Sequence, residues 1–323
     1  MKVLVAGATG AVGKMLIPLL VRRGHKVVGT TRSANRVHTL RSLGAHPVIM
    51  DGLDRDSVLH AVQTAKPDAI VHQMTSLAGN QDLKRLDRNF ETTNRLRTQG
   101  TTSLLAAARV AGTRRIVVQS FTGWPNARDG GPVKTEDDPL DATPPESMHK
   151  TLDAIRELEG TVLTATDLEV IVLRYGAFYG PGTAISVGGD VAELILHRKL
   201  PIVGSGAGVW SFIHMTDVAY ATALAVEGGP SGLYNIVDDE PAPVSVWLPE
   251  LARILGAKPP VHVPEWIAQL MIGESGVSMM TRIRGSSNTK AKRDLKWTPI
   301  HASWRDGFRA EFGTGSVPQA AGR

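Results

Sequence analysis

The chain has 323 residues, of which 42% are hydrophobic and 21% are charged, and its formal net charge is +5. This composition excludes a disordered chain, and the small positive excess, without a basic run, does not favour a nucleic-acid partner. Cysteine is absent, which excludes disulfides, thiol nucleophiles and cysteine-based metal sites. No segment has the roughly 18–20 consecutive apolar residues of a membrane span, and the N-terminus lacks a secretory signal, so we expect a cytoplasmic protein.

Short apolar runs alternate with helical patterns in the first half of the chain. The predicted strands cover residues 3–6, 27–29, 48–50, 69–72, 116–119 and 170–173. The predicted helices cover residues 12–23, 55–65, a long segment around 83–111, and 151–163. Continuous apolar strands that alternate with helices are typical of parallel βαβ units. The sequence therefore predicts an α/β fold with a Rossmann-type, doubly wound parallel sheet.

The pattern changes after residue 182. A strand end and a helix are predicted over 213–226, a strand over 233–237, a helix over 247–255, an extended segment over 259–263 and a short helix over 266–273. The Pro-, Asp- and Gly-rich stretch 124–145 predicts a long surface loop, and long loops are often functional. Residues 313–323 are expected to be a disordered tail.

A glycine-rich turn follows the first predicted strand directly and opens a helix. Its spacing is Gly-x-x-Gly-x-x-Gly. Glycines let the backbone turn sharply and approach a pyrophosphate, whose charge is stabilised by the N–H groups of the helix N-terminus. The strand–turn–helix context favours a dinucleotide site over a structural turn. The expected cofactor-binding residues here are Gly7, Thr9, Gly10, Ala11, Val12 and Gly13.

The end of the second strand indicates which nicotinamide cofactor binds. An NAD site usually places a carboxylate there for the ribose 2′-OH, but this strand ends Thr31-Arg32-Ser33. Arg32 can pair with a 2′-phosphate, and Ser33 can add a hydrogen bond. We therefore predict NADP(H) in preference to NAD(H).

Further passages accompany the glycine turn, at residues 51–54, 173–182, 212–219 and 288–297. With them, residues 1 to about 310 resemble the extended short-chain dehydrogenases/reductases of the nucleotide-sugar epimerase/dehydratase type. The resemblance implies a cofactor domain of residues 1–180 with about 210–237, and a smaller C-terminal substrate domain of residues 181–209 and 238–312. It also implies a small-molecule substrate and is compatible with a homodimer.

The resemblance further implies that two strand ends contact the adenine, ribose and pyrophosphate of the cofactor. The implied residues are Asp51, Gly52, Leu53, Gln73, Met74 and Thr75. Arg174, at the end of the sixth strand, is expected to help hold the cofactor or its neighbouring loop. No metal site is expected, because the acidic clusters 136–138 and 238–240 lack a histidine at ligand spacing. His214 and Asp217 are expected to be structural.

The catalytic pattern of the family is incomplete in this chain. That pattern is Tyr-x-x-x-Lys on one helix, where the ammonium lowers the pKa of the phenol, with a Ser or Thr at the end of strand five. Ser120 supplies the hydroxyl, but no tyrosine precedes strand six. Alignment on Lys150 places Glu146 at the tyrosine position. Alignment on Glu159 places Thr151 and Ile155 at the tyrosine and lysine positions.

Three explanations remain open for the missing tyrosine. Tyr179, or Tyr175, acts as the acid from the segment after strand six. Alternatively, Glu146, His149 or Lys150 acts from the start of the helix. Finally, the protein binds NADP(H) without turnover, as a regulator or sensor. Some alkene reductions need only a hydride donor and a polarising group. The primary expectation is an NADP(H)-dependent oxidoreductase or epimerase/dehydratase-like enzyme in which Ser120 orients the substrate oxygen and Tyr179 is the candidate acid.

Overall fold

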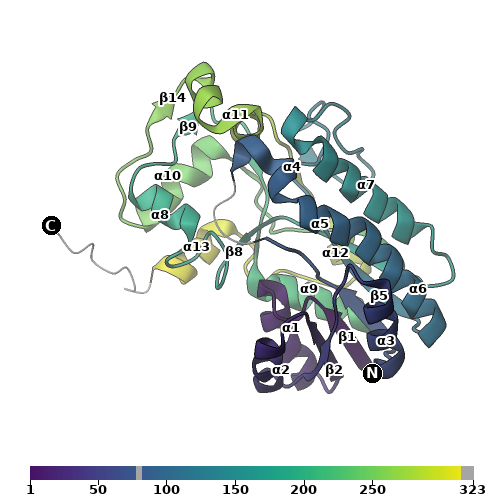
Figure 1. The fold of residues 1–323 in the computed structure, drawn as a ribbon. Helices are drawn as coiled ribbons and strands as arrows, with labels where there is room; N and C mark the ends of the chain where they lie inside the picture. The colour runs from purple at the N-terminus through teal and green to yellow at the C-terminus, as the bar shows by residue number, and fades with distance from the viewer. Residues whose placement is uncertain (78–81, 314–323) are drawn as a thin grey trace.

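Seven parallel strands form the central sheet of the computed structural model, which describes residues 1–77 and 82–313 (Figure 1). The strands are β1 (Lys2–Ala6), β2 (Lys26–Thr31), β3 (His46–Ile49), β4 (Ala69–His72), β5 (Arg115–Phe121), β7 (Glu169–Tyr175) and β12 (Gly232–Ile236). Their order across the sheet is β12-β7-β5-β4-β1-β2-β3. This order confirms the predicted doubly wound α/β fold, and the apolar runs are buried because helices cover both faces.

Alternate residues of the strands belong to two hydrophobic clusters, one on each face of the sheet. In β1, Val3 and Val5 face the cluster under α1 (Ala11–Arg22) and α9 (Met215–Glu227). Leu4 and Ala6 face the opposite cluster. The helices that cover the opposite cluster are α3 (Arg55–Ala65), α6 (Thr101–Ala111) and α7 (His149–Leu163). α2 (Val37–Ser42), which the sequence did not predict, adds Leu40 to the α1 side.

The single long helix expected around 83–111 is wrong. The chain forms a 3-10 turn η2 (Leu83–Arg85), α4 (Leu86–Asn89), α5 (Glu91–Arg95), a π-helical turn η3 (Leu96–Gly100) and then α6. The backbone leaves helical geometry at Phe90, which has φ −95° and ψ 2°. Hydrophobic periodicity does not register a π-turn, because the turn adds one residue without ending the helix.

A third hydrophobic cluster organises the C-terminal part, at the upper left of Figure 1. Its helices are α8 (Asp190–Leu196), α10 (Val244–Ile254), α11 (Glu265–Thr281) and α13 (Trp304–Phe312). Short parallel pairs support them, namely β8 (Ala177–Tyr179) with β11 (Phe212–His214), and β9 (Ile202–Val203) with β14 (His262–Val263). An antiparallel pair joins β10 (Val209–Trp210) to β13 (Ala242–Pro243). Buried aromatic rings such as Phe212, Trp247 and Phe308 form the centre of this cluster.

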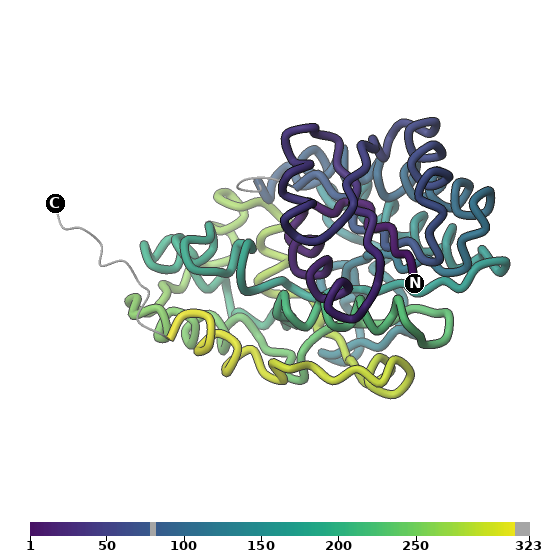
Figure 2. The backbone as a smooth tube through the Cα atoms, turned by 90° about the horizontal axis from the view of Figure 1, so that it is seen from below, coloured from purple at the N-terminus to yellow at the C-terminus, as the bar shows by residue number. Residues whose placement is uncertain are grey.

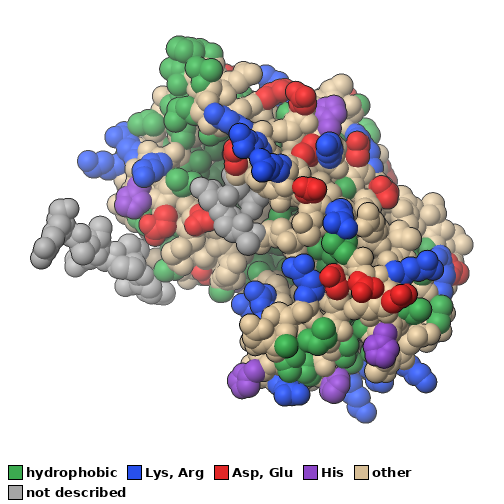
Figure 3. Space-filling view, viewed as in Figure 1, with side chains coloured by type: hydrophobic (Ala, Val, Ile, Leu, Met, Phe, Trp, Pro, Cys, Tyr) green, Lys and Arg blue, Asp and Glu red, His purple; other side chains and the backbone are tan. Residues whose placement is uncertain are grey.

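Helix α11 extends well beyond the short helix expected over 266–273. It continues past a kink at Gly273, where φ is 71°. Trp266, Leu270 and Met271 on this helix are 68%, 72% and 62% exposed, and hydrophobic side chains gather at this end of the molecule (Figure 3). This apolar surface lies far along the chain from the glycine turn.

The loop 124–145 is tied to the C-terminal part and does not lie free on the surface. It contains β6 (Val133–Lys134), which pairs in parallel with β15 (Gly285–Ser286). In Figure 2 the yellow C-terminal segment runs along one side of the molecule, from α12 (Thr289–Asp294) beside β12 to α13 against α10. Of the expected tail, Gly313 follows α13 and residues 314–323 lie outside the described residues. Within the described ranges, no helix is long and apolar enough to cross a membrane.

Candidate active site

The glycine turn packs tightly against the carboxyl end of β4. Gly7 has φ 87°, and a Cβ atom there would overlap the carbonyl oxygen of Gln73. A Cβ on Gly13 would overlap the carbonyl of Ala8. The Gly10 amide donates to the Gly7 carbonyl oxygen over 3.0 Å, which closes the turn. Glycine is therefore required at residues 7 and 13 by close backbone approach.

The start of α1 suits an anion. Gly10 is the N-cap residue, no side chain caps the helix, and its first turn carries no acidic residue. A Cβ on Gly10 would meet only the Gly7 carbonyl oxygen, at 3.3 Å, so the space beside the helix start is not filled by side chains. The N–H groups of the first turn, which include Ala11 and Val12, fit the pyrophosphate of a dinucleotide.

Two arginines lie near the end of β2, and the sequence interpretation identified only one of them. Arg32 is exposed, and the Ser33 hydroxyl donates to Asn35 Oδ1 over 2.7 Å. Arg36, in the 3-10 turn η1 (Ala34–Arg36), donates from Nη1 to the Thr9 hydroxyl over 3.3 Å. Arg36 thus contacts the glycine turn itself. Arg36 follows Arg32 by only four residues, and this spacing could have identified it from the sequence as a second candidate.

The residues expected along the adenine and ribose lie at one edge of the sheet. The Leu53 amide donates to Asp51 Oδ1 over 3.0 Å, and a Cβ on Gly52 would overlap the Met74 sulfur. Gln73 lies against Gly7 and donates from Nε2 to the Tyr175 hydroxyl over 3.1 Å. The exposed residue Thr75 follows directly. The structure therefore brings the ends of β1, β3 and β4 together.

His72, which closes β4, is held inside the fold. Its Nδ1 accepts from the Met74 amide over 3.2 Å, and its Nε2 lies 3.1 Å from the Thr101 hydroxyl. Burial lowers the pKa of His72 to about 4. A neutral imidazole with both nitrogens engaged fits a structural role at neutral pH.

Ser120, Glu159 and Arg174 form a buried hydrogen-bonded group. The Ser120 hydroxyl donates to Glu159 Oε1 over 2.6 Å. Arg174 donates to both oxygens of Glu159, from Nε over 2.8 Å and from Nη2 over 2.5 Å. This group joins β5, α7 and β7. The guanidinium of Arg174 is therefore directed at α7 and not at the glycine turn, and the Ser120 proton is already donated to a carboxylate.

The inward face of α7 contains Thr151 and Ile155, the two residues selected by the alignment on Glu159. Thr151 and Ile155 have no exposed surface, whereas Glu146, His149 and Lys150 are exposed. The Thr151 hydroxyl donates to Asp87 Oδ1 over 2.6 Å. It also accepts from Asn94 Nδ2 over 3.1 Å. The inward face of α7 thus presents a hydroxyl whose proton is already donated and, four residues later, an aliphatic side chain.

The position of Tyr179 does not fit the expectation that it supplies the acid. Its side chain is completely buried in the C-terminal cluster, with ring centroids 5.0 Å from Phe308 and 5.1 Å from His214. Burial raises the pKa of its phenol well above the usual range. Tyr175 is also buried, and its hydroxyl lies 2.7 Å from the Thr222 hydroxyl. Strand pairing between β8 and β11 carries Tyr179 into this core.

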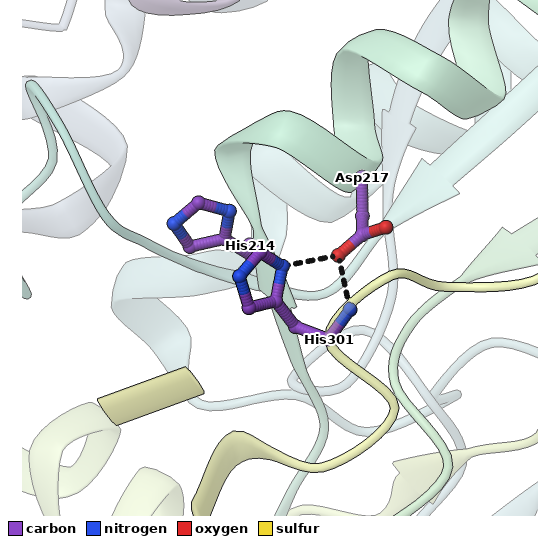
Figure 4. A group of neighbouring side chains, drawn as sticks. All are labelled: His214, Asp217 and His301. Carbon is purple, nitrogen blue, oxygen red and sulfur yellow. Dashed lines mark hydrogen bonds and ion pairs between the residues drawn. The ribbon is translucent and has the colours of Figure 1, made fainter. Parts of the chain in front are cut away.

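His214, Asp217 and His301 meet at the start of α9 (Figure 4). Asp217 Oδ1 accepts from the Ile300 amide over 2.5 Å, and Oδ2 accepts from the His301 amide and Nδ1, each over 3.0 Å. Burial and the neighbouring His301 lower the pKa of His214 to about 4. Because both carboxylate oxygens already accept N–H groups, the cluster fits the structural role expected for His214 and Asp217, and it anchors residues 300–301 to α9.

Comparisons with known proteins agree with this geometry. The model of the NAD dependent epimerase/dehydratase family matches residues 3–236. The chain is 44% identical over 314 residues to a 3-diazoavenalumate denitrifying reductase of Streptomyces sp., covering 96% of this chain and 100% of the relative. It is 29% identical over 267 residues to a 2-alkyl-3-oxoalkanoate reductase of Stenotrophomonas maltophilia (strain K279a), covering 80% and 76% of the two chains. A UDP-glucose 4-epimerase structure from Thermotoga maritima aligns with TM-score 0.75 at 22% identity, covering 97% and 98% of the two chains.

Proposed function

Because this chain belongs to the NAD-dependent epimerase/dehydratase family, we propose that it is an NADP(H)-dependent reductase of a small electrophile that needs no proton from the protein. The observation that carries the proposal is the inward face of α7, where Thr151 and Ile155 are fully buried. Reduction of a carbonyl creates an alkoxide, which a general acid must protonate. Thr151 and Ser120 already donate their protons to Asp87 and Glu159.

A diazo-type electrophile fits a site without such an acid. The relative at 44% identity is named for a diazo substrate and for a denitrifying reduction. For an arenediazonium substrate, the reduced nicotinamide would supply the hydride of the new C–H bond, while the C–N bond breaks and its electron pair leaves with dinitrogen. No oxyanion forms in this reaction, so the buried Thr151 and Ile155 are no obstacle to it.

The preference for NADP(H) rests on the positive charge at the end of β2. Arg32 is exposed there, and Arg36 contacts Thr9 of the glycine turn. No carboxylate follows β2 directly to bind a ribose 2′-OH. Two guanidinium groups suit a 2′-phosphate.

The substrate is placed beyond the carboxyl ends of β4 and β5, where ligands of open α/β sheets bind. Phe121 and Trp124 lie there, both half-buried, with ring centroids 6.2 Å apart. Apolar rings of this kind provide a surface for an aromatic substrate.

The deciding experiment compares two substrates of similar size, 4-carboxybenzenediazonium and 4-carboxyacetophenone. NADPH oxidation is followed by absorbance, products are separated by chromatography, and a reaction without protein gives the background rate. We expect benzoate to appear in a one-to-one ratio with oxidised NADPH, and the ketone to react at least about a hundredfold more slowly, the usual contribution of a general acid.

Ketone reduction at the same rate as the diazonium reaction would overturn the proposal, because it requires a proton donor that these contacts do not provide. Saturable NADPH binding without turnover of either compound would instead favour a cofactor-binding regulator. The Ser120→Ala variant provides a second test of the proposal. Its diazonium turnover is expected to stay within about threefold of the unmodified protein, since the hydroxyl serves Glu159.

A further inference from the structure

Three arginine side chains are buried in the described part of the chain, and they differ in their counter-ions. Arg115 pairs with Glu169 over 2.6 Å, and Arg174 pairs with Glu159 over 2.5 Å. Arg97 is equally buried, at 8% exposure, but forms no ion pair with any residue of 1–77 or 82–313. A buried cation without a counter-ion is costly, so its position calls for an explanation.

The contacts of Arg97 leave one edge of its guanidinium open. Nη1 donates to Asn94 Oδ1 over 3.1 Å, and the group lies 5.6 Å from the centroid of the Phe90 ring. Nε and Nη2 form no hydrogen bond with a described residue, and neither is among the unpartnered polar atoms that are closed off from solvent. Nε and Nη2 share one edge of the guanidinium, the edge that binds a carboxylate with two parallel hydrogen bonds.

Arg97 is positioned by the turn that carries it, near the carboxyl end of β4. It belongs to the π-turn η3, which packs against α7. A Cβ atom on Gly100, which ends this turn, would meet the Met74 methyl group after β4 at 3.4 Å, so the turn lies between α7 and the carboxyl end of β4. Burial lowers the pKa of Arg97 to about 10, which leaves it charged at neutral pH. Glu159 cannot neutralise it fully, because Arg174 and Ser120 already occupy that carboxylate.

The Asn94 amide connects this cation to the helix α7. Asn94 accepts from Arg97 through Oδ1 and donates through Nδ2 to the Thr151 hydroxyl. The π-turn therefore holds Arg97 beside the inward face of α7, and π-turns often occur at functional sites. The side chain is oriented by one hydrogen bond, and its Nε and Nη2 have no partner among the described residues.

We propose that Arg97 binds a carboxylate of the substrate through Nε and Nη2, and so selects anionic over neutral substrates. This inference rests on the proposed reductase function, because it places the carboxylate beside the cofactor. A guanidinium fits this role better than an ammonium, since its planar fork matches both carboxylate oxygens.

The test uses cinnamate and its neutral analogue cinnamamide as probes. Binding to the full chain, saturated with NADP⁺, is measured by isothermal titration calorimetry. We expect the unmodified protein to prefer cinnamate by at least about tenfold, the usual effect of a charge-assisted pair. Arg97→Gln should abolish that preference, and Arg97→Lys should retain part of it. Arg95→Gln, which removes an exposed charge two residues away, should leave it unchanged.

An equal preference for cinnamate in the Arg97→Gln and unmodified proteins would overturn the proposal. An equal loss of affinity for cinnamate and cinnamamide, or a loss of NADPH affinity, would also overturn it, because Arg97 would then be structural or would bind the cofactor. If Arg97→Gln fails to fold, the Arg97→Lys variant decides by the same ratio. The readout is binding, so absence of diazonium turnover with an intact cinnamate preference would refute the reductase function alone.

Discussion

Arg32 and Arg36 follow the end of β2, and neither has a carboxylate partner within the described residues. Arg36 also contacts the glycine turn through the Thr9 hydroxyl. Two unpaired guanidinium groups at one site attract an anion more strongly than either alone. The structure therefore adds Arg36 to the Arg32 that the sequence indicated.

The Arg32→Ala variant should weaken NADPH binding by about tenfold or more, because a charge-assisted hydrogen bond to the 2′-phosphate is lost. NADH affinity should change by less than about twofold, since NADH has no 2′-phosphate. Fluorescence titration with each cofactor measures both values. Arg41→Ala, at an exposed position at the end of α2, is the matched control. Equal losses for NADPH and NADH would contradict the assignment of Arg32.

Single residues also show what sequence alone could predict. Gly7 and Gly13 were identified from spacing, because close backbone approach leaves only glycine at those positions. Tyr179 was misjudged, since its place in the C-terminal core depends on pairing between β8 and β11, which are far apart in the chain. Arg97 was missed because burial of a charged side chain leaves no trace in local hydrophobic patterns.

At the scale of elements, the Ser120–Glu159–Arg174 group joins two strands to α7 through buried charge. Glu159→Ala would leave the Arg174 guanidinium buried without a counter-ion. We expect the free energy of unfolding to fall by about 3–5 kcal/mol, as for other broken buried pairs. Urea denaturation measures this change. The double variant Glu159→Leu with Arg174→Met should be less destabilised than Glu159→Ala, because it leaves no unpaired charge.

A second ion pair on the same helix provides the control for that prediction. Asp153 and Arg156 pair over 2.9 Å on the exposed face of α7. Asp153→Ala should cost less than about 1 kcal/mol, since exposed pairs contribute little. A loss of similar size in Asp153→Ala and Glu159→Ala would show that the buried group has no special role in joining β5, α7 and β7.

Some helices and strands were predicted accurately from the sequence and others were not, and the reasons are physical. The strands of the sheet were located because each is a short apolar run buried on both faces. The helix α3 was located over the same residues, 55–65, and the Asp54 side chain caps it by accepting hydrogen bonds from the Asp56 and Ser57 amides. The sequence did not predict the separate short helices within 83–111. Neither the break at Phe90 nor the π-turn changes the average hydrophobic pattern.

At the scale of the whole molecule, buried neutral histidines make stability depend on pH. His72 has a pKa of about 4 in the folded protein, against about 6.5 when unfolded. Between these values the unfolded chain binds a proton that the folded chain does not, so stability falls as the pH falls. From pH 7 to pH 5, His72 should cost about 2 kcal/mol, and His214 acts in the same direction.

Urea unfolding at pH 7 and pH 5 tests this dependence. The His72→Gln variant should be less stable at pH 7, because the imidazole contacts with Thr101 and Met74 are lost. Its loss of stability between the two pH values should nevertheless be smaller than in the unmodified protein, by about 2 kcal/mol. His60→Gln, at an exposed position on α3, is the control and should leave the difference unchanged. An unaltered pH dependence in His72→Gln would contradict the argument.

The π-turn of η3 determines where the Arg97 guanidinium lies relative to α7. The π-turn holds one residue more than a turn of the α-helix around it, and it lies within the helical segment 91–111. Deleting one residue there would restore a regular helix and rotate one flank by about 100° relative to the other. The apolar residues of that flank would turn with it, and the guanidinium would leave its place beside α7. One residue gained or lost in this turn would therefore decide whether α7 has this cation beside it.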